Sequence, residues 1–221
     1  MSNMVLNSLG RAVPTEIPGL GKFDPFNGPF ARLNGDYEFR RLGGRRLVSL
    51  HARDKVTESI RTAIERSGLK SGMTVSFHHH MRNGDQVLTK IMREIAAMGI
   101  KDLTLAPSSL TDAHEIVADL IETGVVTGIF SSGMRGRIGQ VVSEGKLPRP
   151  AVIHSHGGRA RAIEEGRIQI DVAFLGAPAC DCYGNMTGST GASACGSLGY
   201  AMMDAKYASH VVAVTDNLCS Y

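Results

Sequence analysis

Four segments of the sequence concentrate histidine, arginine, hydroxyl and glycine residues that can take part in chemistry. They are His78–Asp85 (HHHMRNGD), Ser131–Arg137 (SSGMRGR), Ile153–Arg159 (IHSHGGR) and the long stretch Asp171–Tyr200. Arginine binds carboxylates through paired hydrogen bonds. Glycine-rich turns at helix N-termini point backbone N–H groups at an anion or a developing oxyanion. Together these features favour a polyanionic carboxylate substrate and acyl chemistry at a carbonyl.

Each segment also has a purely structural interpretation. Three consecutive histidines cannot all point the same way from an extended backbone, so at least one of His78, His79 and His80 is expected only to pack. Arg135 and Arg137 can neutralise a helix end. The cysteines at 180, 182 and 195 are most often small buried apolar residues. We expect no metal site, because H-x-H and C-x-C lie on separate elements and no carboxylate stands at a zinc spacing.

Several common catalytic motifs are missing from the sequence. No serine lies in a G-x-S-x-G elbow, which disfavours a serine hydrolase. There is no G-x-x-x-x-G-K-[ST] motif, and no G-x-G-x-x-G follows a predicted strand, which disfavours the usual nucleotide sites.

The four segments follow predicted strands in a chain where strands alternate with helices. A capping Asp54 begins a predicted helix that ends at Gly68, and a predicted capping pair, Asp112 and Glu115, begins another. Predicted strands lie at 73–77, 103–106, 125–130, 151–154, 168–175 and 210–215. This alternation indicates an α/β fold with an open, mostly parallel sheet covered by helices on both faces. Ligands bind such sheets outside the carboxyl ends of the strands, which places the four segments at one edge.

The composition is that of an ordinary globular protein. The chain has 221 residues, of which 43% are hydrophobic and 20% charged. We see no secretory signal and no apolar run long enough to span a membrane, and we expect free thiols and a cytoplasmic location. Because the chain stops just past a predicted strand, we expect another domain or subunit to complete the sheet.

The first 50 residues are expected to form an irregular, extended arm, with a short strand near Leu47–Leu50 and the α/β domain at 51–221. The net charge of +3 comes from this arm, mainly from its arginines, Arg40, Arg41, Arg45 and Arg46. No aromatic interleaving or nucleic-acid module accompanies them, so we expect a solvated or subunit-contacting arm and no nucleic-acid partner.

Four longer runs resemble the α subunit of citrate lyase, in that family's order and spacing. They are SFHHHMRNGD (76–85), IFSSGMRGRIGQVVSEGKL (129–147), IHSHGGR (153–159) and DVAFLGAPACDCYGNMTGSTGASACGSLGYAMMDA (171–205). The resemblance covers roughly residues 50–221. It implies a CoA-transferase-like fold whose second, similar domain is absent from this chain, with the site lying between the two domains.

The resemblance also implies an activity. Citrate displaces acetyl from a thioester, by way of a mixed anhydride, and a separate β subunit cleaves the resulting citryl thioester. The thioester is carried on CoA or on the CoA-derived prosthetic group of an acyl carrier γ subunit. The chain itself is expected to bind no cofactor and to form a homo-oligomer.

On this basis we assign expected roles to residues of the four segments. Residues expected to polarise the carbonyl, hold the substrate or stabilise an oxyanion are His79, His156, Gly157 and Gly158. Residues expected to contact citrate carboxylates, CoA phosphates or the thioester are Arg82, Arg135, Arg137, Arg159, Ser132, Gly188, Gly191 and Gly196.

Three other functions remain open at this point. The same fold could serve a sugar-phosphate isomerase or a ligand-sensing domain. A metal-dependent hydrolase would use His154, His156, Cys180 and Cys182. The chain could also be a non-catalytic half of the enzyme that serves only subunit assembly.

Overall fold

The computed structural model describes residues 4–7, 9–19, 21–22, 55–78, 84–197 and 199–220. The chain divides into two compact units, Met1–Arg41 and Leu42–Tyr221. The predicted boundary at residue 50, the predicted strand near Leu47–Leu50 and the predicted cap Asp54 lie outside the described residues. The four arginines at 40, 41, 45 and 46 lie outside them as well.

The N-terminal unit contains two short antiparallel hairpins. Strand β1 (Met4–Leu6) pairs with β2 (Ala12–Pro14), and β3 (Glu16–Ile17) pairs with β4 (Gly21–Lys22). The side chain of Asn7 closes the first turn by accepting hydrogen bonds from the backbone N–H groups of Leu9, at 2.9 Å, and Arg11, at 3.0 Å. The prediction of irregular structure is therefore wrong for these residues, because strands of two or three residues are too short to show a period.

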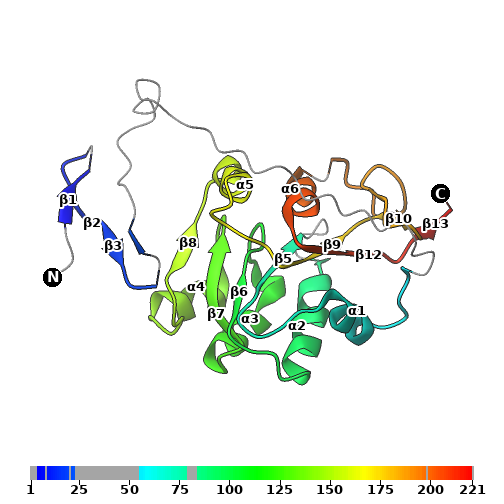
Figure 1. The fold of residues 1–221 in the computed structure, drawn as a ribbon, viewed down its shortest axis with the longest axis horizontal. Coiled ribbons are helices and arrows are strands. Elements are labelled where there is room, and N and C mark those ends of the chain that lie inside the picture. The colour runs from blue at the N-terminus through cyan, green and yellow to red at the C-terminus, as the bar shows by residue number, and fades with distance from the viewer. Residues whose placement is uncertain are drawn as a thin grey trace. The chain divides into compact units, whose positions relative to one another are not determined.

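The second unit is built on a six-stranded parallel sheet with the strand order β12-β9-β5-β6-β7-β8 (Figure 1). Every neighbouring pair in it is parallel. The strands are β5 (Thr74–His78), β6 (Leu103–Leu105), β7 (Val126–Ser131), β8 (Ala151–Ile153), β9 (Val172–Gly176) and β12 (His210–Val214). The predicted α/β fold with a mostly parallel sheet is confirmed.

Helices cover both faces of this sheet (Figure 1). One face carries α1 (Ile60–Ser67), α2 (Val87–Ala97), α3 (Ile116–Glu122) and α4 (Gly136–Ser143), and the other carries α5 (His156–Glu164) and α6 (Gly199–Tyr207). Side chains alternate along a strand, so β9 sends Val172 and Phe174 into the larger core and Ala173 and Leu175 into the smaller one. A strand buried on both faces is typical of a parallel sheet.

Two predicted helix starts are wrong. Helix α1 begins at Ile60, where the side chain of Ser59 accepts a hydrogen bond from the N–H of Thr62 at 3.1 Å. Before α3, a 3-10 helix (η2, Asp112–His114) replaces the predicted Asp112–Glu115 cap. In both places the N-cap is a serine or a threonine, Ser59 or Thr111, instead of the predicted aspartate. The sequence alone did not show which of these possible capping residues is used.

Residue His114 of η2 connects two parts of the larger core. Its Nδ1 accepts a hydrogen bond from the N–H of Thr111 at 3.0 Å, so its Nε2 carries the proton and donates it toward Asp85 Oδ2 at 3.2 Å. Both side chains are buried. The other oxygen of Asp85 accepts a hydrogen bond from the N–H of Val87 at the start of α2. This buried pair therefore fixes α2 against the loop that follows β6.

The stretch Asp171–Tyr200 contains more regular structure than predicted. After β9 it forms β10 (Ala179–Asp181) and β11 (Met186–Thr187), and these join β13 (Leu218–Cys219) in a small sheet of order β11-β10-β13. Asp181 closes the turn between β10 and β11 by accepting hydrogen bonds from the backbone of Tyr183 and from both the backbone and the side chain of Asn185. The bond from the Asn185 side chain contributes most to lowering the pKa of Asp181.

Candidate active site at the carboxyl edge of the sheet

The predicted site lies where the carboxyl ends of the strands meet. Strands β5 and β9 are neighbours although three strands separate them in sequence, so the winding of the sheet reverses between them. Ligands bind open α/β sheets at such a switch point. The loop after β5, residues 79–83, lies outside the described residues, so the roles of His79 and Arg82 stay predictions.

The loop after β7 presents Ser132 at this edge. Its neighbour Ser131 is buried, and its hydroxyl donates to the carbonyl of Gly133 at 3.0 Å, while the N–H of Ser132 donates to the carbonyl of Ser108 at 3.0 Å. These bonds fix the loop backbone. The Ser132 hydroxyl remains partly exposed and lies 3.4 Å from the hydroxyl of Tyr200.

Helix α5 begins directly after β8, so the predicted loop His156–Arg159 is in fact its first turn. The hydroxyl of Ser155 caps the helix by accepting a hydrogen bond from the N–H of Gly158 at 3.1 Å. That amide is therefore already used, which argues against Gly158 as an oxyanion donor. The amides of His156 and Gly157 belong to the first turn, which has no partners within the helix, and both residues are exposed. They are the donors this helix end offers to an anion.

Arg159, which we expected to contact a citrate carboxylate or a CoA phosphate, lies inside the protein. Its side chain is 0% exposed, and its Nη2 lies 3.0 Å from Asp204 Oδ1 and 3.0 Å from the hydroxyl of Ser76. It also donates to the carbonyl of Ala106 at 2.5 Å. The Ser76 hydroxyl in turn lies 2.6 Å from Asp204 Oδ2. This cluster joins β5, the loop after β6, α5 and α6 beneath the site.

Asp204 is also 0% exposed. Burial raises its pKa above the usual value, and the Arg159 charge and the hydrogen bonds from Arg159 and Ser76 oppose that rise. A carboxylate so deep in the fold is retained only with charge and hydrogen-bond partners. The pair Arg159–Asp204 is therefore a structural support for the site in this arrangement.

Tyr200 is the residue around which the site side chains gather. Its ring lies 5.3 Å from the ring of His156, measured between centroids, and the Arg159 guanidinium carbon lies 5.5 Å from its centroid. Its hydroxyl faces Ser132. Three of the four predicted segments thus meet at one tyrosine.

His154 directly follows β8, and its ring lies 6.3 Å from the ring of Phe130, measured between centroids. Its Nε2 is buried and has no hydrogen-bond partner in the described part of the chain. Burial lowers its pKa most, and the positive charges of Arg159 and Arg167 lower it further. It is therefore held in the neutral form.

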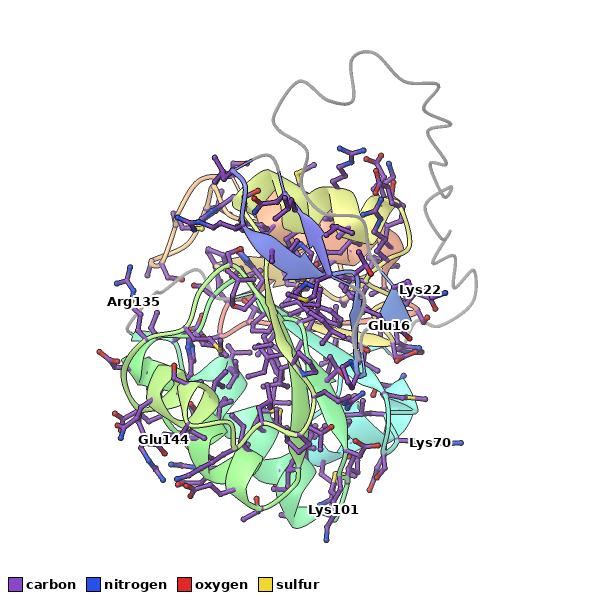
Figure 2. All side chains as sticks on the ribbon, turned by 90° about the vertical axis from the view of Figure 1, so that its left-hand side faces the viewer. Glu16, Lys22, Lys70, Lys101, Arg135 and Glu144 are labelled. Carbon is purple, nitrogen blue, oxygen red and sulfur yellow. The ribbon has the colours of Figure 1, made fainter. Side chains whose placement is uncertain are left out.

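Two predicted arginines, Arg135 at the N-cap of α4 and Arg137 in its first turn, lie at the surface. Arg137 forms ion pairs with Asp119 at 2.6 Å and Glu122 at 3.5 Å on α3. These carboxylates, Asp119 first, raise its pKa, so its charge is already balanced and substrate contact is disfavoured. Arg135 stands at the N-cap of α4, is exposed, and projects away from the body of the protein (Figure 2).

The predicted glycines of the long stretch shape its backbone. The carbonyl of Gly188, which is buried, accepts hydrogen bonds from the N–H groups of Cys195 and Gly196, each at 2.9 Å. This closes a ring of backbone over residues 188–196. Gly191 has φ +94° and lies against Pro178, so that a Cβ there would meet the Pro178 carbonyl oxygen at 2.6 Å. Whether these glycines contact a thioester stays a prediction.

The four cysteines are free thiols. The pKa of Cys180 is raised, and burial is the largest cause of that rise. Among the described residues, no group of three or more His, Cys, Asp and Glu side chains could hold a metal ion. This gives no support to a hydrolase built on His154, His156, Cys180 and Cys182.

A comparison with known families shows the family to which the chain belongs. A sequence model described as "Citrate lyase, alpha subunit (CitF)" matches residues 53–221. The chain belongs to this family.

Curated members of the citrate lyase α family include the citrate lyase alpha chains of Haemophilus influenzae, 53% identical over 175 residues, and Klebsiella pneumoniae, 50% identical over 167 residues. The matches cover 79% and 76% of this chain but 35% and 33% of those proteins. The chain therefore spans about a third of the length of the curated relatives it matches.

Solved structures agree on the fold. A structure assigned as the alpha subunit of citrate lyase from Streptococcus mutans, in complex with citrate, is 49% identical with a TM-score of 0.85, covering 97% of this chain and 41% of that chain. A malonate decarboxylase alpha subunit from Acinetobacter baumannii is 17% identical, with a TM-score of 0.50, over 73% of this chain and 29% of that chain. The second likeness concerns the fold alone. None of the described helices is long and apolar enough to cross a membrane.

Three residues of the site were not among the predicted ones: Ser76, Tyr200 and Asp204. Tyr200 and Asp204 stand four residues apart, which places them on one side of a helix. That spacing was the available signal. Ser76 gave none, because it alternates with apolar residues in a buried strand and 128 residues separate it from Asp204.

Proposed function

We propose that this chain belongs to the transferase component of citrate lyase, which exchanges acetyl for citrate on a thioester. The products are citryl thioester and acetate. The observation that carries this proposal is membership of the citrate lyase α family, at about half identity to its curated chains. The solved relative that holds citrate supports citrate as the substrate.

The exchange can be written so that every bond is accounted for. A carboxylate oxygen of citrate attacks the carbonyl carbon of the acetyl thioester, the C–S bond breaks, and a mixed anhydride and a thiolate form. The thiolate then attacks the citryl carbonyl of the anhydride, and acetate leaves with the bridging oxygen. Each attack places negative charge on a carbonyl oxygen, so donors fixed beforehand lower both barriers.

The described residues offer such donors. The first-turn amides of His156 and Gly157, which have no partner within the helix, lie at the positive end of the α5 dipole and suit a developing oxyanion. The Arg159–Asp204 pair would keep that end of α5 in place against α6. Arg135 is exposed at the same edge and carries no ion pair within the described residues, so among the predicted arginines that the structure describes it is the best placed to meet a carboxylate or a CoA phosphate.

The remaining components follow from the same proposal. The donor thioester would be carried on CoA or on the CoA-derived group of the γ subunit, and the β subunit would cleave the citryl thioester. The chain itself would bind no cofactor, would act in the cytoplasm as part of an oligomer, and would share its site with a second CoA-transferase-like domain.

A second candidate function is a non-catalytic half that serves assembly. The observation in its favour is that two of the predicted substrate-binding arginines are already paired, Arg137 with Asp119 at the surface and Arg159 with Asp204 in the interior. It predicts citrate-independent binding to the other subunits and no exchange under any condition.

An exchange assay separates the two candidates. Acetyl-CoA and carbon-labelled citrate are incubated with the assembled enzyme, meaning this chain combined with the remaining two thirds of a curated relative and with the γ subunit. Without the β subunit, label should accumulate in the thioester fraction in step with acetate release. Absence of label there, with the subunits assembled, would favour the scaffold.

A further inference from the structure

Tyr200 stands where three separate elements meet at the carboxyl edge of the sheet. It lies in the first turn of α6, and its hydroxyl is 3.4 Å from that of Ser132 in the loop after β7, 68 residues away. Both side chains are only partly buried. A ligand at this edge can therefore reach both hydroxyls.

The Tyr200 ring is held on two sides. The His156 ring packs against it at 5.3 Å with a tilt of 39°, and the Arg159 guanidinium carbon lies 5.5 Å from its centroid. Arg159 is in turn anchored by Asp204, one helical turn after Tyr200. An immobile cation against the ring favours one ring position, so the direction of the hydroxyl is set before any ligand arrives.

The two hydroxyls have hydrogen-bonding capacity to spare. Each carries one proton, and only one proton can lie between two oxygens. Their separation of 3.4 Å is long for an O–H···O bond, which is usually about 2.7–2.8 Å. Both protons can therefore turn toward a third atom that accepts them.

The charge around the hydroxyls favours an anionic acceptor. The Arg159 Nε and Nη1 are buried and have no hydrogen-bond partner in the described part of the chain. The first-turn amides of α5 add positive potential from the same side. Asp204 is bound by Arg159 and Ser76 and lies on the interior side of this cluster.

We propose that the hydroxyls of Ser132 and Tyr200 together bind a carboxylate group of the substrate. This inference rests on the proposed citrate exchange and names two residues that contact the substrate in it. Neither hydroxyl changes its covalent state. Each donates a hydrogen bond, and the pair orients the carboxylate beside the free amides at the start of α5.

The test is Tyr200→Phe in the assembled enzyme, compared with Tyr207→Phe on the same helix. Both variants remove one phenolic hydroxyl and keep the ring, but the Tyr207 hydroxyl bonds Glu164 at 3.3 Å, away from the site. A hydrogen bond to a charged group is strong enough that its loss weakens binding at least about tenfold. Tyr200→Phe should therefore raise the KM for citrate about tenfold, and Tyr207→Phe should leave it unchanged.

Ser132→Ala provides a second, independent arm. Because the two hydroxyls share one ligand group, the double variant Ser132→Ala/Tyr200→Phe should lose less affinity than the product of the single losses. Citrate titration by calorimetry measures this without relying on turnover.

The outcomes are distinct. Unchanged citrate affinity in both Tyr200→Phe and Ser132→Ala, with an active wild type, overturns this inference and leaves the proposed exchange standing. Equal losses in Tyr200→Phe and Tyr207→Phe overturn it too, because the hydroxyl position would then be irrelevant. A wild-type assembled enzyme that neither exchanges nor binds citrate overturns both proposals.

Discussion

Asp204→Asn should destabilise the fold far more than the loss of a surface ion pair. Both Asp204 and its partner Arg159 are 0% exposed, at 3.0 Å from each other. Asparagine keeps the size of the side chain but removes its charge, so Arg159 is left as an uncompensated buried cation. Breaking a buried pair in this way costs about 3–5 kcal/mol, a large part of the ~5–15 kcal/mol that stabilises a typical domain.

The assay is urea unfolding of wild type and variant, with the free energy of unfolding taken by linear extrapolation. The matched control is Arg137→Gln, which removes a pair of similar length, 2.6 Å to Asp119, from the surface. The control should change the free energy of unfolding only slightly, because exposed pairs are screened by water and salt.

The double variant Asp204→Asn/Arg159→Met tests whether the unpaired buried charge causes the destabilisation. It removes both charges, so no unpaired ion remains buried, and buried pairs can be replaced by apolar groups at little cost. The double variant should therefore be more stable than Asp204→Asn alone. A double variant less stable than the single one, or a single variant no worse than Arg137→Gln, would refute the interpretation of this pair.

Two further predictions concern pH and backbone shape. The pKa of His154 is lowered in the folded state, so below about pH 6.5 the unfolded chain binds a proton that the folded chain does not. The free energy of unfolding should therefore decrease as the pH is lowered through this range. In urea unfolding followed from pH 7.5 to 5.5, His154→Gln should make this decrease smaller. An unaltered slope would contradict this. Gly191→Ala should lower the unfolding temperature more than Gly184→Ala. The two glycines have similar positive φ, +94° and +90°, but only a Cβ at residue 191 would meet backbone, at 2.6 Å from the carbonyl oxygen of Pro178. Equal effects would show that the close approach to Pro178 is unimportant.

The parallel sheet was predictable from sequence because each element carries its own local signal. In α2 the apolar residues Val87, Leu88, Ile91, Met92 and Ile95 recur at helical spacing, and the predicted strands at 73–77 and 103–106 lie on either side of it. Since parallel strands end at one edge, the sequence also predicted which loops meet there. Both predictions depend only on periodicity and on the rules of α/β winding.

The burial of individual polar residues was not predictable in the same way. Arg159 and Arg135 both follow glycine or methionine in polar loops, yet one is 0% exposed and the other lies in solvent. The difference arises from Asp204, which is 45 residues away from Arg159 in sequence. A pairing of that kind depends on how α5 and α6 pack together, and no local pattern records it.

The contacts around Tyr200 also could not be predicted from sequence. No role in the site was predicted for Tyr200, and the structure gives it contacts with His156, Arg159 and Ser132. Each of these three partners was predicted as a site residue. Their common contact was not, because it depends on how α5, α6 and the loop after β7 come together in space.

The central claim is most directly tested by the fate of a carboxylate oxygen. Citrate labelled with oxygen-18 in its carboxylates is supplied, with acetyl-CoA, to the enzyme assembled without the β subunit, and the acetate released is analysed by mass spectrometry. Exchange through a mixed anhydride predicts that each acetate carries one oxygen-18 atom from citrate, in step with the formation of citryl thioester. Release of unlabelled acetate, or no release in the presence of citrate, would contradict the proposed function.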